Sequence, residues 1–197
     1  MPINPTKQNI IETAFNLFKE KGYSQVTVNE ICEACRITKT TFYYHLTSKE
    51  DIITNFYESV TQSLANRLID IFSAGNNWEQ LMVCFDTLID ATERIGCDLF
   101  GQLYIMNLKE NKGTFDFDDD LTKVAVLLIA RAQKSGQIRN QSPALRLYRA
   151  AAHAFEGYEL MWCIKNGGFD RKEMIRSAME DIFDVEPSLR MEQQSED

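Results

Sequence analysis

Two helix-start signals close together near the N-terminus constrain the fold of this chain most strongly. The segment Thr27-Val28-Asn29-Glu30 is a capping box, in which the Thr27 hydroxyl accepts from the Glu30 amide and Glu30 reaches back. It predicts a short helix from Val28 to about Cys35. After a turn, Thr38 is expected to cap a second short helix that ends near His45. Two short helices joined by a tight turn are the layout of a helix-turn-helix unit.

The rest of the chain also repeats its apolar residues with a helical period, and no segment alternates with the period of two that strands need. We therefore predict an all-α fold in two domains. Three helices form a domain over residues 1–48, and a long helix from Lys49 to about Ser73 leads into a helical domain over 49–185. Residues 186–197 are expected to be a disordered tail. The further helices are expected over 78–94, 97–109, 121–134, 143–165 and 169–183.

Charge is distributed unevenly along the 197 residues, whose net charge is −8. Residues 1–50 hold six basic and five acidic residues, whereas residues 51–197 hold 15 and 24. Because salt screens charges beyond about 10 Å, a protein that binds DNA needs a local basic patch rather than a basic whole. No apolar run reaches the roughly 18 residues of a membrane helix, so we expect no membrane contact and a cytoplasmic location. The five cysteines, an odd number, are expected to be free thiols.

The segment 37–46, "ITKTTFYYHL", divides into an inward and an outward face. Phe42 and Leu46 are four residues apart and are expected to pack against the domain. The outward residues are expected to lie in the DNA major groove and are Lys39, Thr40, Thr41, Tyr43, Tyr44 and His45. Lys39 would donate to guanine, and the tyrosines and His45 would reach phosphates. Thr27 and Lys49, at the starts of flanking helices, are also expected to contact phosphates.

Residues 10–53 resemble the DNA-binding domain of the tetracycline-repressor (TetR/AcrR) family. The matching landmarks are Ala14, Phe18, Gly22, Thr27, Ile31, Thr38-Lys39, Thr41 to His45 and Lys49. The resemblance implies a homodimer that binds a double-stranded DNA operator, with a larger C-terminal domain for a small-molecule effector. It also implies DNA contacts at the positions of Thr38 to His45 and of Lys49. Arg36 departs from the pattern, because the family usually has glycine in this turn. We expect Arg36 to adopt a left-handed backbone or to reshape the turn, and to add a phosphate contact.

The C-terminal half supplies the expected effector pocket and dimer interface. Its aromatic and methionine side chains suit a mostly apolar or aromatic ligand, with a few polar groups to orient it. The predicted pocket residues are Met82, Phe85, Phe100, Tyr104, His153, Glu156, Glu159 and Trp162. If Glu156 or Glu159 is buried, it needs an arginine or a cationic ligand as partner. The last two helices resemble the family's dimer interface, which implies a four-helix bundle.

Two functional alternatives remain open from the sequence. The first is a ligand-responsive transcriptional regulator, most simply a repressor released from a palindromic operator by its effector. The second is a DNA-binding co-activator or division factor of the same fold, controlled by a protein partner. No matched nucleophile and base, metal cluster or cofactor motif is found, so neither an enzyme nor a cofactor is expected. The sequence leaves open whether Cys32-Glu33-Ala34-Cys35 has a redox role.

Overall fold

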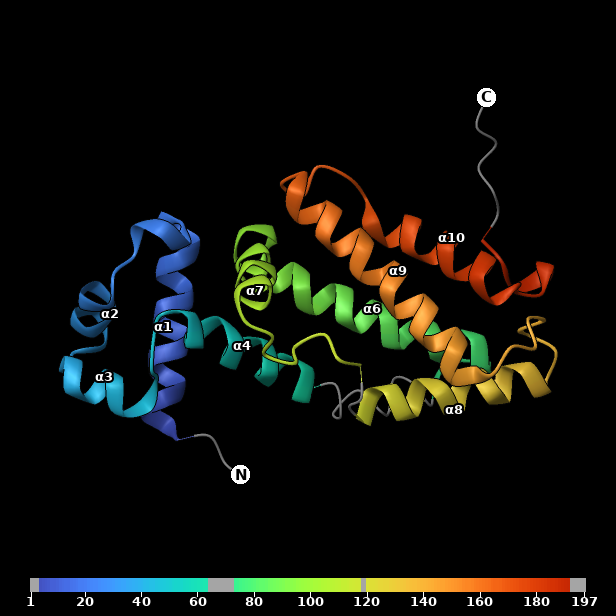
Figure 1. Ribbon diagram of the computed structural model, residues 1–197, viewed down its shortest axis with the longest axis horizontal. Helices are drawn as coiled ribbons and strands as arrows, with labels where there is room; N and C mark the ends of the chain where they lie inside the picture. The colour runs from blue at the N-terminus through green and yellow to red at the C-terminus, as the bar shows by residue number, and fades with distance from the viewer. Residues whose placement is uncertain (1–3, 64–72, 118–119, 192–197) are drawn as a thin grey trace. The chain divides into compact units, whose positions relative to one another are not determined.

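The protein is helical throughout the part of the chain that the computed structural model describes, residues 4–63, 73–117 and 120–191 (Figure 1). Within those ranges β-structure is limited to one isolated bridge between Ile138 and Val185. The elements in chain order are α1 (Pro5–Lys21), η1 (Tyr23–Gln25), α2 (Val28–Cys35), α3 (Lys39–His45), α4 (Glu50–Ser63), α6 (Asn77–Ile95), α7 (Cys97–Lys109), α8 (Asp120–Lys134), α9 (Ala144–Ile164), α10 (Arg171–Phe183) and η3 (Pro187–Leu189). The all-α prediction is confirmed.

Local sequence signals set the ends of these helices. Asn4 caps α1 by accepting from the Thr6 amide at 2.9 Å, and Pro5 occupies the first turn, where its missing N–H costs nothing. Gly22 ends α1 with a φ of 82°, which suits a residue without Cβ. The predicted helix over 97–109 coincides with α7. The prediction that the fourth helix continues to Ser73 falls largely on residues 64–72, which lie outside the described residues.

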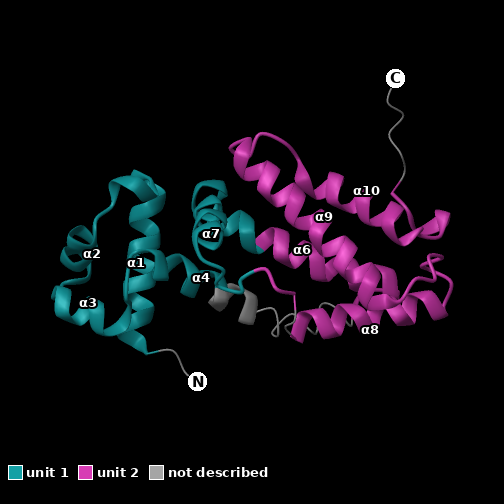
Figure 2. Ribbon diagram, viewed as in Figure 1, with its two compact units in different colours: residues 1–62, 91–114 teal, residues 63–90, 115–197 magenta. Residues whose placement is uncertain are grey.

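The chain divides into two compact units (Figure 2). Unit 1 contains residues 1–62 and 91–114, and unit 2 contains residues 63–90 and 115–197. Helix α6 therefore contributes to both units. The division differs from the domains expected from sequence, because α7 joins the N-terminal helices in unit 1. The assignment of residues 1–48 as the DNA-binding domain stays a prediction.

Unit 1 is held together by aromatic contacts between its helices. The rings of Phe15 in α1 and Phe56 in α4 stack with centroids 3.8 Å apart. Tyr57, the next residue of α4, lies 5.9 Å from the ring of Phe100 in α7. Each contact buries large apolar area, and an aromatic pair adds about 0.5–1.5 kcal/mol beyond that burial. These contacts make α4 the element between α1 and α7.

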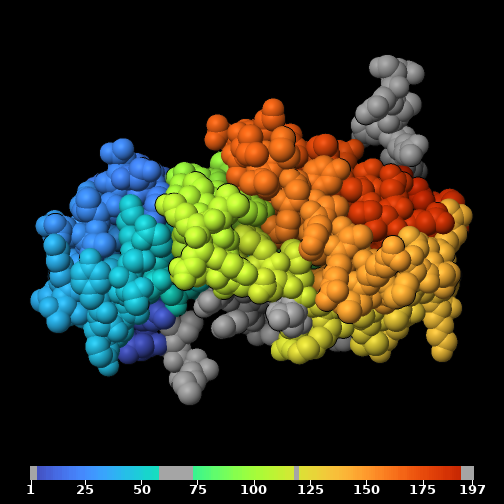
Figure 3. All heavy atoms as spheres, viewed as in Figure 1, coloured from blue at the N-terminus to red at the C-terminus, as the bar shows by residue number. Residues whose placement is uncertain are grey.

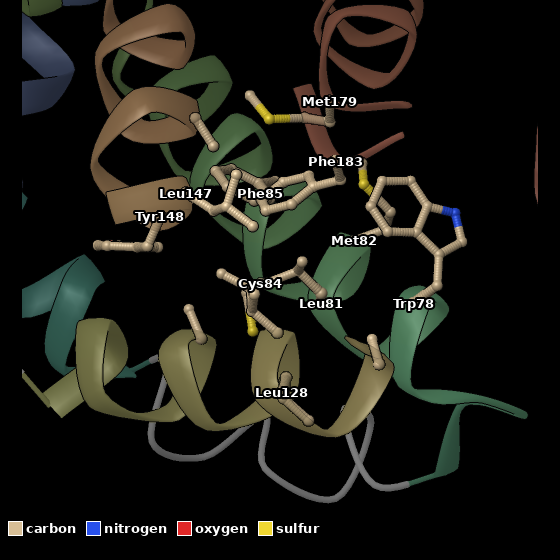
Figure 4. Packing of buried hydrophobic residues seen from close by; sticks show 14 of the residues in the cluster. Trp78, Leu81, Met82, Cys84, Phe85, Leu128, Leu147, Tyr148, Met179 and Phe183 are labelled. Atoms are coloured by element: carbon tan, nitrogen blue, oxygen red, sulfur yellow. The ribbon is translucent and has the colours of Figure 1, made fainter. Parts of the chain in front are cut away.

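Unit 2 has one hydrophobic core to which four helices contribute (Figure 4). The close-up shows Trp78, Met82 and Phe85 of α6 facing Met179 and Phe183 of α10, with Leu147 of α9 and Leu128 of α8 beside them. The fully buried members include Trp78, Leu81 and Phe183. Burying a side chain of this size contributes about 1.5–3 kcal/mol, so the core is the main source of stability in this unit.

The expectation of a disordered tail from residue 186 is wrong for residues 186–191. Pro187–Leu189 forms η3, and the Arg190 guanidinium donates to the Val185 carbonyl at 2.8 Å. The Met191 amide donates to a carboxylate oxygen of Glu180 at 3.0 Å. These bonds hold the segment against the end of α10. No local pattern in the sequence predicts this arrangement. Among the described residues, no helix combines the length and the apolar character that crossing a membrane requires.

Candidate DNA-binding site

The capping box predicted at Thr27 is present. The Glu30 amide donates to the Thr27 hydroxyl at 3.3 Å, and the Thr27 amide donates to a Glu30 carboxylate oxygen at 2.8 Å. Lys21 forms an ion pair with the other Glu30 oxygen at 3.0 Å. The Thr27 amide bond, followed by the Lys21 and Thr27 side chains, lowers the pKa of Glu30 to about 2. The start of α2 is therefore fixed, and Thr27 is exposed beside it.

Arg36 adopts a left-handed conformation, with φ 55° and ψ 43°. This is one of the two alternatives expected from the sequence. Its amide donates to the Glu33 carbonyl at 3.1 Å, and the Ile37 amide donates to the Cys32 carbonyl at 2.9 Å. This pair of bonds is a Schellman motif, which normally places glycine at the left-handed position. A residue with a Cβ costs roughly 1 kcal/mol there. The exposed Arg36 side chain thus stands in the turn between the two short helices.

Helix α3 has the two faces that its sequence predicted, with one refinement. Phe42 and Leu46 are 0% and 2% exposed, whereas Tyr43 and Tyr44 are 53% and 82% exposed. Lys39 and Thr40 are exposed as well. Tyrosine combines an apolar ring with a polar hydroxyl and is enriched at interfaces, so these two exposed side chains suit contact with a partner.

The refinement concerns both ends of α3. Thr38 caps the helix by accepting from the Thr41 amide at 3.1 Å, and its hydroxyl lies 2.9 Å from that of Thr41. Thr41 and His45 are only half-buried, so they are less outward than expected. The ring of His45 lies 4.9 Å from that of Tyr44, edge to face. The most accessible part of α3 therefore consists of Lys39, Thr40, Tyr43 and Tyr44.

Lys49 has an internal role that sequence reasoning missed. Its ammonium donates to the carbonyls of Tyr23 and Val26 at 2.8 and 2.9 Å. It also lies 4.0 Å from the centroid of the Tyr23 ring. The next residue, Glu50, accepts from the Tyr23 hydroxyl at 3.1 Å. Two of the three N–H donors of Lys49 are therefore used within unit 1, and the predicted phosphate contact has to compete with these bonds.

Residues 10–55 match the family model described as bacterial regulatory proteins of the tetR family. The matched segment contains α2, α3, the Arg36 turn and the start of α4, which are the elements of the site above. Residues 10–55 therefore have the pattern of a tetR-family DNA-binding segment.

Named relatives extend this result. The chain is 30% identical over 95 residues to the uncharacterized HTH-type regulator YuxN of Bacillus subtilis, covering 46% of this chain and 33% of YuxN. It is 38% identical over 64 residues, 32% of either chain, to IcaR of Staphylococcus epidermidis, a negative transcriptional regulator of a biofilm operon. These matches span only about a third of the length of either relative.

Solved structures give the same fold over more of the chain. FadR of Thermus thermophilus, a TetR-family transcriptional repressor solved in complex with lauroyl-CoA, aligns with a TM-score of 0.61. The alignment covers 97% of this chain and 99% of FadR at 19% identity. At this identity the likeness establishes the fold, a TetR-type helix-turn-helix followed by a larger helical domain.

The predicted pocket residues fall in both units. Phe100 and Tyr104 lie on α7 in unit 1, with ring centroids 5.1 Å apart. Met82 and Phe85 are 1% and 3% exposed in the core of unit 2. The other four are on α9 in unit 2, where His153 is exposed, Glu156 is half-buried, and Glu159 and Trp162 are buried. Their role in effector binding stays a prediction.

Glu159 is buried and has an arginine partner, which is one of the two kinds of partner that its burial was predicted to require. The Arg171 Nε lies 2.8 Å from a Glu159 carboxylate oxygen, with 4% and 0% of the two side chains exposed. The Arg171 guanidinium also lies 3.5 Å from the Trp162 ring centroid and donates to the Ile89 carbonyl at 3.2 Å. The buried carboxylate is therefore balanced within unit 2, and a cationic ligand is not needed for that purpose.

The two cysteines of the C-x-x-C, Cys32 and Cys35, are not joined by a disulfide in this structure. Cys32 is buried and Cys35 half-buried on α2. Burial, followed by the neighbouring Cys35, raises the pKa of the Cys32 thiol. Because the thiolate is the reactive form, this environment disfavours reaction at Cys32 at neutral pH.

Proposed function

We propose that the protein is a ligand-responsive transcriptional regulator that binds a palindromic operator as a homodimer. The observation that carries this proposal is the exposed face of α3, where Lys39, Thr40, Tyr43 and Tyr44 project from a helix held by buried Phe42 and Leu46. A helix presented in this way fits the major groove of B-DNA, with its N-terminal residues at the base edges. Thr27 and Arg36, exposed on either side of α2, suit phosphate contacts.

We propose that the protein represses transcription of the genes it controls. IcaR is named a negative regulator and Thermus thermophilus FadR a repressor, and both resemble this chain. In a repressor, an effector that favours a dimer geometry mismatched to the operator releases the DNA.

A mostly apolar effector fits unit 2 best. FadR was solved with lauroyl-CoA, a long apolar chain on a polar carrier. The core of unit 2 contains Met82, Phe85, Phe155 and Met179, and unbranched methionines repack readily around an apolar chain. Buried Glu159 is paired with Arg171, so it leaves no reason to require a cationic effector.

Helices α9 and α10 are the proposed interface between the two copies. They pack against each other in unit 2, and Figure 3 shows α9, in orange, on the visible surface. Exposed apolar side chains on α9 include Leu160, Met161 and Ile164, at 41%, 43% and 61%. These three lie on one face at helical spacing, and Gly157 on the same face leaves open space for a close approach. A second copy would bury this surface in a four-helix bundle.

The experiment is a DNA-selection assay with the purified protein, followed by footprinting of the recovered sequence. We expect a palindrome with two protected half-sites about 34 Å, one helical turn, apart or a small multiple of it. Lauroyl-CoA and unacylated coenzyme A are then titrated into the complex, and only the acylated compound should release the DNA. Recovery of no preferred sequence would refute the DNA-binding proposal, and a lack of release by any acyl chain would refute the proposed effector class.

A further inference from the structure

Lys49, which follows the helix-turn-helix, is bonded to residues that precede it. The ammonium of Lys49 donates to the carbonyls of Tyr23 and Val26, which lie 26 and 23 residues earlier in the chain. Both α2 and α3 lie between these points. The two bonds therefore close the chain segment that contains the whole helix-turn-helix.

The carbonyls that Lys49 binds belong to the short helix η1, which leads directly into the capping box at Thr27. Tyr23 is the first residue of η1 and Val26 is its C-cap. The Tyr23 carbonyl also accepts from the Val26 amide, at 3.4 Å. By holding this turn, Lys49 fixes where α2 begins relative to the first residue of α4.

Tyr23 and Glu50 strengthen the same junction. Tyr23 is 7% exposed, its ring lies under the Lys49 ammonium, and its hydroxyl donates to Glu50 at 3.1 Å. Burial, and then the Glu50 carboxylate, raise the pKa of Tyr23, so the hydroxyl stays protonated and keeps donating. Two successive residues at the start of α4 are thus bonded to one tyrosine of η1.

We propose that Lys49 is a positioning residue for DNA recognition, which holds the helix-turn-helix to α4 through η1, rather than a phosphate contact. The inference rests on the proposed DNA-binding function. An ammonium that donates to two carbonyls and lies on an aromatic ring has one N–H left, and turning it toward a phosphate would break bonds that orient α2 and α3. The small size of the ammonium fits this position, and a planar guanidinium would not reproduce its geometry.

The test compares Lys49→Met, Lys49→Arg and the control Lys19→Met, which removes an exposed lysine of α1 in the same unit. Operator affinity is measured against salt concentration, because each phosphate contact contributes about 0.9 to the slope of log affinity on log salt. We expect both Lys49 variants to lose at least about tenfold in affinity, the factor that one charge-assisted hydrogen bond represents, with an unchanged slope. A phosphate contact predicts instead that the slope falls by about 0.9 in Lys49→Met and that Lys49→Arg binds like the wild type.

Amide hydrogen exchange of the DNA-free protein supplies a second, independent readout. The amides of Val26 and Ile31, which are bonded to the Tyr23 and Thr27 carbonyls, should exchange faster in both Lys49 variants than in Lys19→Met. Unchanged exchange at these amides, or the phosphate pattern of salt slopes, overturns the proposal. If the wild type prefers no DNA sequence, the proposed function fails, whereas the exchange result still decides whether Lys49 holds η1.

Discussion

Removing the guanidinium of Arg171 should destabilise unit 2 severely. In the native protein this group lies 2.8 Å from Glu159, whose side chain is 0% exposed, and over the ring of Trp162. The change Arg171→Met fills much of the volume but leaves the Glu159 carboxylate without its ion-pair partner. A buried carboxylate in that condition must either stay charged at a high cost or take up a proton.

The expected loss follows from the burial of the pair. Removing one partner of a buried ion pair costs about 3–5 kcal/mol. The adjacent residue supplies the control, because Lys172 pairs with Asp86 at 3.3 Å while its side chain is 55% exposed. An exposed pair of this kind contributes about 0–1 kcal/mol, so Lys172→Met should change the free energy of unfolding little.

Urea unfolding followed by tryptophan fluorescence measures the difference. Both tryptophans of the chain, Trp78 and Trp162, belong to unit 2, so their emission reports on this unit. We further expect that the double variant Glu159→Leu with Arg171→Met is more stable than Arg171→Met alone, because no charge then remains buried. If Arg171→Met loses no more than Lys172→Met, the reasoning about the buried pair is refuted.

Three further predictions concern the turn, the cap and the dimer. Arg36→Gly should raise the free energy of unfolding by up to about 1 kcal/mol, because glycine accepts the left-handed backbone, and a lower free energy of unfolding contradicts this. If Arg36 contacts a phosphate, the same change should reduce the slope of log affinity for the operator on log salt by about 0.9. Glu30 contributes stability that is complete above pH 4.5 and is lost as the pH falls toward 2, since its pKa is lowered to about 2 in the folded protein. Acid unfolding followed by circular dichroism should show that Glu30→Gln loses less stability over this pH range than the wild type, and an equal loss of stability would disprove the effect. Met161→Asp on the apolar face of α9 should convert the dimer to monomer in analytical ultracentrifugation. Leu127→Asp changes a side chain of α8 that is 51% exposed, against 43% for Met161, and should leave the dimer intact; the reverse result rejects the interface.

Local features of the fold were predictable because a few neighbouring residues determine them. The Thr27 capping box and the helix over 97–109 each depend on side chains within one or two helical turns. The left-handed Arg36 was one of two alternatives, and it was expected because the family that this segment resembles usually has glycine in the turn. Glu159 was predictable in part, since burial of a carboxylate implies a cationic partner, although the sequence did not say that Arg171 would provide it.

Contacts between distant residues were not predictable. The bonds of Lys49 to η1 depend on how the chain folds back over more than twenty residues, and the same lysine at a helix start equally suggests a phosphate contact. The ordered segment 186–191 depends on Arg190 and Met191 meeting the end of α10. The membership of α7 in unit 1 likewise depends on Phe100 packing near Tyr57. In each case tertiary packing decides between arrangements that are locally equivalent.

Operator binding by variants of α3 tests the central claim most directly. Lys39→Ala and Tyr43→Ala remove two exposed side chains and keep the buried Phe42 and Leu46, although Tyr43→Ala also removes the edge-on contact of the Tyr43 ring with Phe42, at 5.3 Å between centroids. Fluorescence anisotropy with the selected operator, at one fixed salt concentration, should show a loss of about 1–3 kcal/mol in binding free energy for Lys39→Ala, the range of a specific base contact. Tyr43→Ala should also weaken binding, while the urea midpoint of Lys39→Ala stays at the wild-type value. If both variants bind the operator as tightly as the wild type, α3 is not the recognition helix and the account is wrong.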